Sequence, residues 1–270
     1  MPQSLLLDQT ALATFEICPR RFQLRYLERL PWPSSPLDRR QSQAVERGSQ
    51  FHRLVERHFL GLPVQAAAIG DDVVRDWWTR FAHSNPVIPN GKLWPEHRLT
   101  IPIGGNFLTG RFDLLILGEE DGRPYASLFD WKTSRPRAAA ELEPAWQTRL
   151  YLALVAESGQ AFFQGGQPLT ADRISLTYWY PGEPDQPRVV TYSEEKHQQN
   201  WSEIQALAAA IEAYEADEIW PLTSDYGRCR TCMYQTYCGR QEAGTAETIF
   251  AEETAPYAVE TAVLLEPQTP

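Results

Sequence analysis

The sequence has no long hydrophobic run. Its apolar stretches, such as SLLL at residues 4–7 and LLIL at residues 114–117, are far shorter than the roughly 20 residues that a membrane-spanning helix needs. The N-terminus also lacks the basic-then-apolar pattern of a secretory signal peptide. A membrane-spanning or secreted protein is therefore not expected, and we expect this one to be cytoplasmic.

Two kinds of functional pattern are missing as well. The sequence contains no glycine-rich phosphate loop and no Walker motif, so any nucleotide-driven motor must be another protein. Only four of the 270 residues are cysteines, which is too few for a disulfide scaffold, and a cytosolic protein keeps its thiols reduced. The positions of these cysteines, rather than their number, must decide their role.

Positive charge is scarce at the C-terminal end of the chain. Residues 241–270 contain six Glu and no Lys or Arg, so they supply more than half of the formal net charge of -10. Residues 1–240 carry 25 basic and 29 acidic residues, a balance that weakens but does not exclude phosphate binding. We expect residues 1–240 to form one folded domain and residues 241–270 to form an acidic, disordered tail.

The hydrophobic periodicity changes along the chain, and 43% hydrophobic residues are enough for a substantial core. Spacings of three and four residues predict helices over residues 8–30, with a break at Pro19, and over residues 41–60, 71–83, 143–158 and 194–216. A period of two predicts a meander of strands over residues 93–103, 107–117 and 125–133, and later strands over residues 174–180 and 188–192. The expected fold class is α/β, with a central mixed sheet between helices.

The segment LFDWKTS, residues 128–134, places charges in a strand that is otherwise apolar. Asp130 and Lys132 are two residues apart and share one face of the strand, with Phe129 and Trp131 on the other. Alone, the pair would be interpreted as a cross-strand ion pair on a half-exposed sheet. The preceding strand, however, carries one charged residue, Asp113, inside the apolar run FDLLIL. Because the two strands are expected to pair, the two acids and the lysine should converge.

Two carboxylates and a lysine suit the hydrolysis of a phosphodiester. Carboxylates hold Mg²⁺ or Mn²⁺ through oxygen ligands, and such an ion polarises the phosphate and activates a water molecule. The lysine ammonium can orient that water or stabilise the charge that develops on the phosphate oxygens. This chemistry would explain why charged residues are tolerated in a strand where burial of charge is costly.

Two helical motifs accompany the charged strands. In GSQFH, Gly48 and His52 share a helix face, and the glycine leaves room near the imidazole for another backbone or a metal ion. In QTRLY, Gln147 and Tyr151 share a face of the helix that follows the Asp130 strand. Taken singly, His52 is more often a packed histidine, and the second pair carries little information.

Four motifs in this order resemble those of a known family: GSQFH, GRFD, DWK and QTRLY. They resemble the successive motifs of the RecB-like branch of the PD-(D/E)XK nuclease superfamily, over roughly residues 9–240. Each motif is loose, but the ordered set is specific. The resemblance implies a restriction-endonuclease-like core in which His52, Asp113 and Asp130 bind the divalent ion.

The resemblance also implies roles for other polar residues. It makes Lys132 the catalytic lysine and places Gln147 and Tyr151 near the DNA backbone. Phe112 stands where the superfamily name expects proline, a departure that is usual in this branch. Glu96, in WPEHRL on the preceding strand, is either a further acid of the site or half of a structural salt bridge.

The four cysteines flank the nuclease motifs. Cys229, Cys232 and Cys238 lie in CRTCMYQTYC, and Cys18 lies near the N-terminus. A CxxC with two unrelated buried thiols fits this spacing, and so does a four-cysteine site, which suits Zn²⁺ as well as iron. The arrangement resembles the [4Fe-4S] staple of the AddB nuclease domain and of four-cysteine CRISPR-associated exonucleases, and only that resemblance favours iron. Such a staple would join a helical N-terminal cap to the C-terminal segment.

Arginines lie next to the cysteines in the sequence. Arg20, Arg21 and Arg25 follow Cys18, and Arg230 lies inside the CRTC motif. They form either a solvated basic face or, once the staple gathers them, a patch that guides DNA.

The function that these patterns and the resemblance imply is metal-dependent DNA cleavage. We expect an exonuclease acting on single-stranded ends in DNA repair, recombination or defence, with a helicase or a CRISPR-type protein as a partner. The alternative is a non-catalytic, cluster-stapled module for DNA binding or assembly. Such a module would have no use for the costly charges of Asp113, Asp130 and Lys132.

Overall fold

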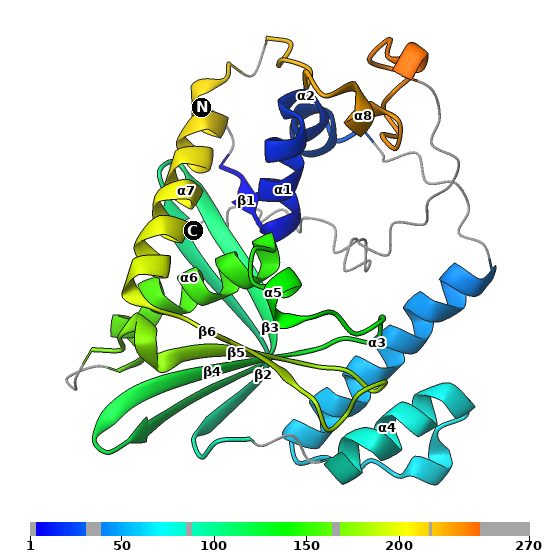
Figure 1. Ribbon diagram of the computed structural model, residues 1–270, viewed down its shortest axis with the longest axis vertical. Helices are drawn as coiled ribbons and strands as arrows, with labels where there is room; N and C mark the ends of the chain where they lie inside the picture. Colours follow the sequence, from blue (N-terminus) through cyan, green and yellow to red (C-terminus); the bar gives the residue numbers. More distant parts are fainter. Residues whose placement is uncertain (1–3, 31–38, 85–87, 164–167, 216–217, 244–270) are drawn as a thin grey trace, which may run out of the picture.

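Figure 1 shows the computed structural model of the protein, which describes residues 4–30, 39–84, 88–163, 168–215 and 218–243. A mixed sheet runs through the centre of the molecule, and helices cover both of its faces. The predicted α/β class with a central mixed sheet is therefore confirmed. Nearly all of the expected acidic tail, from residue 244 onward, lies outside the described residues.

The described part of the sheet contains six strands: β1 (Leu6–Leu7), β2 (Lys92–Ile103), β3 (Asn106–Glu120), β4 (Arg123–Trp131), β5 (Ile174–Trp179) and β6 (Arg188–Thr191). The strands β2, β3 and β4 pair antiparallel in sequence order, as the predicted meander requires. β4 then pairs parallel with β5, and β5 pairs antiparallel with β6. β1 is not predicted from the sequence, because two residues are too few to show a period.

β3 holds two partners along one of its edges. β2 pairs with the other edge, whereas β1 pairs at Phe107 and Leu108 and β4 pairs from Leu114 to Glu120. Within the described sheet, the residues of β3 between these two contacts have no strand partner on that edge. Asp113 is the last of them, so it lies at the point where β3 and β4 separate.

A two-residue turn joins β3 to β4. Asp121 and Gly122 have φ values of 53° and 71°, the left-handed conformation that an Asp-Gly turn of type I′ adopts. This turn fixes the hairpin register, in which Glu120 lies opposite Arg123. The same register brings the Asp113 end of β3 to the Asp130 end of β4.

The helices among the described residues are α1 (Gln9–Ile17), α2 (Pro19–Phe22), α3 (Arg39–Phe59), α4 (Asp72–Ser84), α5 (Ala139–Leu142), α6 (Trp146–Phe162), α7 (Glu194–Ala213) and α8 (Tyr226–Cys229). The predicted break at Pro19 is confirmed, since α1 ends at Ile17, Cys18 is extended and α2 starts with the proline. Proline suits a first helical position because its missing N–H would have no partner there. Within the described residues, no helix is long and apolar enough to cross a membrane.

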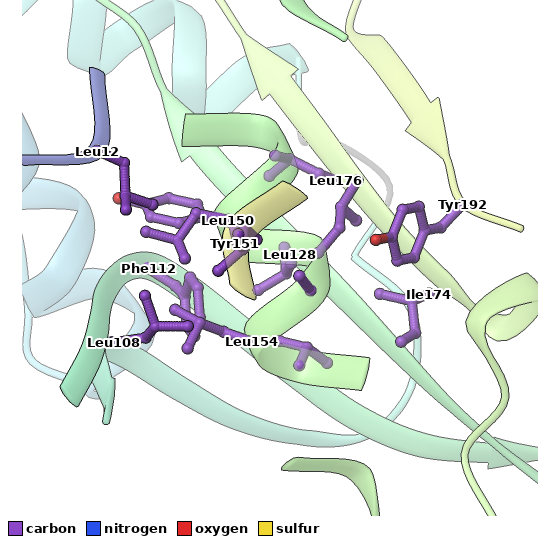
Figure 2. Close-up of a cluster of buried hydrophobic side chains, with 14 of the residues drawn as sticks. Leu12, Leu108, Phe112, Leu128, Leu150, Tyr151, Leu154, Ile174, Leu176 and Tyr192 are labelled. Atoms are coloured by element: carbon purple, nitrogen blue, oxygen red, sulfur yellow. The ribbon is translucent and has the colours of Figure 1, made fainter. Parts of the chain in front are cut away.

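The larger core cluster lies between the sheet and the helices α1, α6 and α7, which cover one of its faces (Figure 1). Figure 2 shows α6 at its centre, where Leu150 and Leu154 face Leu108 and Leu128 of the sheet. Gly110 of β3 allows this close approach, because a Cβ at that position would lie 2.8 Å from Leu154 Cδ1. The helix that carries the QTRLY motif is thereby held directly against β3.

A second, aromatic cluster lies on the opposite face, under α3 and α4. Phe51 of α3 stacks on Trp179 with ring centroids 5.8 Å apart, and Phe59 stacks on Trp131 at 5.9 Å. Aromatic side chains of this size dominate the burial energy of such a contact. These two stacks fix α3 against β4 and β5, which places His52, next to Phe51, at the sheet.

The N-terminal helices contact the segment that follows α7. The Gln23 side chain donates to the carbonyl of Glu218 at 2.6 Å and accepts from the backbone N–H of Trp220 at 2.9 Å. Phe22 stacks on the Trp220 ring at 5.8 Å. The expected N-terminal cap is therefore joined to the C-terminal segment by contacts that need no metal.

Candidate active site

The two strand acids lie where β3 and β4 separate. One Asp113 oxygen, Oδ2, accepts a hydrogen bond from the backbone N–H of Trp131 at 2.7 Å. Asp113 and Asp130 are both buried, with exposed fractions of 8% and 4%. The predicted convergence of the two acids is therefore present in the structure, and the hairpin that carries them is rigidly paired up to Leu114 and Phe129.

The course of β3 changes at Asp113. Phe112 and Leu114 are two residues apart and would share a face in a regular strand, yet Phe112 belongs to the larger cluster and Leu114 to the aromatic one. Glu96 of β2 lies opposite Asp113, between two regular pairs of β2 and β3, and has a φ of 49°. The irregularity allows groups from both faces of the sheet to reach one place.

Lys132 and Gln147 surround Asp130. The Lys132 ammonium lies 2.8 Å from Asp130 Oδ1 and donates to Gln147 Oε1 at 2.8 Å. The Gln147 amide donates in turn to Asp130 Oδ2 at 2.6 Å. The glutamine, the second residue of α6, therefore fixes the lysine and the carboxylate relative to each other.

Tyr151 lies one helical turn beyond Gln147 and is 5% exposed. Its ring packs edge-on against Phe112 at 4.9 Å, and its hydroxyl accepts from the Gln147 amide at 3.3 Å. Little of the Tyr151 side chain reaches the surface, and its expected position near a DNA backbone stays a prediction. In the structure Tyr151 supports Gln147.

His52 reaches the site from α3, on the other side of the sheet. Its Nδ1 lies 3.2 Å from Asp113 Oδ1. Gly48 brings the helix close to the end of β4, since a Cβ at that position would lie 3.1 Å from the Thr133 hydroxyl. The space that the glycine was expected to leave therefore accommodates Thr133.

The electrostatics of the site follow from burial and from these pairs. Burial alone would lower the pKa of His52, but the Asp113 carboxylate outweighs it and raises that pKa. Burial would likewise raise the pKa of Asp113, yet His52 lowers it overall. Burial raises the pKa of Asp130, and Lys132 offsets this only in part. Burial and the neighbouring Asp113 charge raise the pKa of Glu96 to about 7.

Three side chains present ligand atoms that could hold one metal ion. Among the described residues, the atoms of His52, Glu96 and Asp113 all lie within 4.8 Å of one another. The sequence assigned His52 and Asp113 to the ion and left Glu96 open. Asp130, the other expected ligand, is bonded to Lys132 and Gln147. Buried carboxylate and imidazole groups of this kind suit Mg²⁺ or Mn²⁺.

The four cysteines line one pocket. All four are free thiols: Cys18, Cys229, Cys232 and Cys238. The pocket that they line has a volume of about 360 Å³, which includes the open solvent at its mouth. The structure thus brings Cys18 beside the three cysteines of the C-terminal segment. Three arginines share the lining, and they are Arg21, Arg228 and Arg240.

The arginines that were expected to contact DNA differ in position. Arg20 is 8% exposed and its guanidinium lies 2.6 Å from Glu28, so little of this side chain reaches the surface and its contact with DNA stays a prediction. Arg25 is half-buried with its guanidinium over the Tyr26 ring. Arg230 is exposed and donates to the carbonyl of Ala243 at 3.0 Å.

The family to which the chain belongs follows from its match to a protein-family model. The model of the PD-(D/E)XK nuclease superfamily matches residues 7–239, which contain all four motifs and all four cysteines. The chain belongs to the PD-(D/E)XK nuclease superfamily. PD-(D/E)XK nucleases act on DNA and use divalent metal ions, and the buried oxygen and nitrogen ligands described above fit such ions.

No curated protein matches the sequence of this PD-(D/E)XK nuclease. Among solved structures, it is similar to one named SSO0001, with 14% identity, 88% of this chain and 87% of that chain covered, and a TM-score of 0.37. It is also similar to a candidate exonuclease from Eubacterium rectale, with 10% identity, 77% and 80% of the two chains covered, and a TM-score of 0.46.

Proposed function

We propose that this PD-(D/E)XK nuclease is a divalent-metal-dependent deoxyribonuclease with its active site at the separation of β3 and β4. The observation that carries the proposal is the Lys132–Asp130–Gln147 triplet, in which a half-buried lysine is held at 2.8 Å from both partners. An ion pair in a sheet needs no glutamine bridging its two members. A reacting lysine does need a fixed position, because misplacement of a catalytic group is costly.

His52, Asp113 and Asp130 would hold the ion. When bound, it supplies Lewis acidity toward the scissile phosphate and the attacking water. Lys132 places its ammonium where charge develops on the phosphate oxygens, and Gln147 keeps that ammonium oriented. The hydrophobic side chains behind both strands exclude water from the rear of the site and strengthen these interactions.

The substrate and pathway belong to the same proposal. The order of the motifs GSQFH, GRFD, DWK and QTRLY supports the RecB-like branch and, with it, exonucleolytic cleavage of single-stranded ends in repair, recombination or defence. Such a cytoplasmic enzyme would work with a helicase or a CRISPR-type partner. The half-buried Arg21 and Arg25 and the exposed Arg230 are the remaining candidates for guiding DNA.

The cysteine pocket is proposed to hold a structural [4Fe-4S] cluster, with Zn²⁺ as the alternative occupant. Four thiols on one pocket form a donor set that suits either. The lining arginines supply positive charge next to thiolates, which favours a ligated over an empty pocket. Residues 7–239 would then form one metal-stapled nuclease domain.

A cleavage assay tests the activity. The purified protein is incubated with linear and circular, single- and double-stranded DNA in Mg²⁺, in Mn²⁺ and in EDTA. We expect cleavage of single-stranded linear DNA with either ion, none in EDTA, and a loss of at least about 100-fold in Lys132→Met. Lys196→Met is the matched control. Lys196 also pairs with a carboxylate, that of Glu143, but this pair is exposed and contains none of the site residues. Wild-type rates in Lys132→Met would contradict the mechanism.

A further inference from the structure

Glu96 has a backbone conformation that its sequence does not explain. It lies inside β2, yet its φ of 49° is in the left-handed region, which costs a residue with a Cβ conformational energy. The other described non-glycine residues with positive φ are Asp121 and Arg29, which lie in a turn and just after a helix. A left-handed residue inside a strand interrupts the pairing, and strain of this kind is concentrated at functional sites.

The strain places a carboxylate beside another carboxylate. Regular pairs flank Glu96 on both sides, Pro95 with Leu114 and His97 with Phe112, so the irregularity is confined to one residue. A carboxylate oxygen of Glu96 lies within 4.8 Å of ligand atoms of both Asp113 and His52. The half-buried Glu96 and the buried Asp113 repel each other at this range when both are charged. The conformation therefore costs both backbone strain and charge repulsion unless a cation lies between the two carboxylates.

Two basic side chains of the protein, Arg111 and His52, lie near Glu96. Arg111 Nε lies 3.4 Å from Glu96 Oε2, and a salt bridge of this length is weak. A purely structural role for Glu96 would rest on this contact and on the nearby His52 imidazole. It would not explain why the strand adopts a left-handed residue that turns the acid toward Asp113.

We propose that Glu96 is a ligand of the divalent ion, and that together with His52 and Asp113 it offers one nitrogen and carboxylate oxygens from α3, β2 and β3. The inference rests on the proposed function and adds a protein ligand from a strand outside the four motifs. Asp130, which the proposed function also assigns to the ion, keeps its ion pair with Lys132. Hard divalent ions prefer such oxygen-rich ligand sets.

The test measures ion binding without DNA. Mn²⁺ is titrated into the purified full-length protein by calorimetry, and its effect on the melting temperature is recorded for wild type, Glu96→Gln and Glu96→Gly. Both variants should bind Mn²⁺ at least about tenfold more weakly. Glu96→Gly should nevertheless melt no lower than wild type in the absence of ions, because glycine adopts a positive φ without strain.

Two control variants separate the alternatives. Arg111→Met removes the salt bridge and should leave the Mn²⁺ affinity within about threefold of wild type, since a single long, half-buried ion pair contributes little. Glu119→Gln removes an exposed acid of the same sheet and should change neither affinity nor melting temperature.

The outcomes distinguish this inference from the proposed function. If Glu96→Gln binds Mn²⁺ as tightly as wild type while Asp113→Asn does not, Glu96 is no ligand and the nuclease proposal stands. If Glu96→Gln and Arg111→Met lose equal stability with unchanged affinity, Glu96 is a salt-bridge residue. If the wild-type protein itself binds no Mn²⁺, the metal-dependent function is wrong.

Discussion

The carboxylate of Asp113 accepts a hydrogen bond from the backbone N–H of Trp131 over 2.7 Å. This bond continues the contact between β3 and β4 after their regular pairing has ended at Leu114 and Phe129. The other Asp113 oxygen lies 3.2 Å from His52 Nδ1. One side chain therefore completes the sheet with one oxygen and builds the active site with the other.

The first prediction follows from this division. Asp113→Asn keeps an oxygen for the Trp131 N–H but loses the charge, so it should abolish cleavage and Mn²⁺ binding with little change in stability. Asp113→Ala should lose both functions and, in addition, about 1–3 kcal/mol of unfolding free energy, because a buried donor is left unpaired. Urea unfolding of the two variants measures the difference. Equal stability of both would mean that the hydrogen bond to Trp131 is unimportant.

The second prediction concerns Gln147 as a positioning residue. Gln147→Leu cannot bridge Lys132 and Asp130, so kcat should fall by about 10- to 100-fold while KM for DNA changes little. Gln198→Leu, on the exposed face of α7, is the control. Steady-state kinetics on a single-stranded oligonucleotide separates the two constants. A raised KM at unchanged kcat would instead assign Gln147 to binding of the DNA backbone.

The third prediction concerns the cysteine pocket. Cys18→Ser should lower the melting temperature, bleach the brown colour of an iron–sulfur protein and reduce cleavage indirectly, because a ligated metal contributes to folding. The N-terminal cap should nonetheless stay attached, since Gln23 still bonds to Glu218 and Trp220. Iron, sulfide and zinc analysis after anaerobic purification identifies the occupant. Stoichiometric zinc without sulfide would replace the cluster, and an empty wild-type pocket would remove the metal staple altogether.

The fourth prediction concerns the residues after Ala243. Truncation there removes five of the acidic residues and no basic one, so cleavage should persist and DNA should bind more tightly at low salt, with a smaller gain at high salt. Fluorescence anisotropy at two salt concentrations provides the measurement. A truncated protein that fails to fold would show that these residues belong to the domain.

The sequence predicted the meeting of Asp113 with Asp130 because strand alternation and a short Asp-Gly turn leave few registers for the hairpin. The break at Pro19 was equally predictable, since proline cannot continue a helix interior. Both predictions depend only on the residue types in a short stretch of the sequence. The two-residue strand β1 could not be predicted in this way, because its place is set by β3, about a hundred residues away.

Two residues of the site region show where sequence rules stop. Glu96 was left undecided between an acid of the site and a salt bridge, because a period of two assumes extended backbone and its positive φ breaks that assumption. Arg20 was expected at a DNA-guiding surface, but the chain turns so that it lies against Glu28, eight residues on. In a run of several arginines, the sequence does not indicate which guanidinium will be buried.

The Asp121–Gly122 turn has a practical consequence. It is exposed, and seven strand residues separate it from Asp113, roughly 26 Å at the usual rise of a strand. Exposed loop tips of this kind tolerate short insertions. A peptide tag inserted between the two residues would anchor the protein to a glass surface away from the candidate active site, so that the proposed exonuclease activity could be followed on single labelled DNA strands.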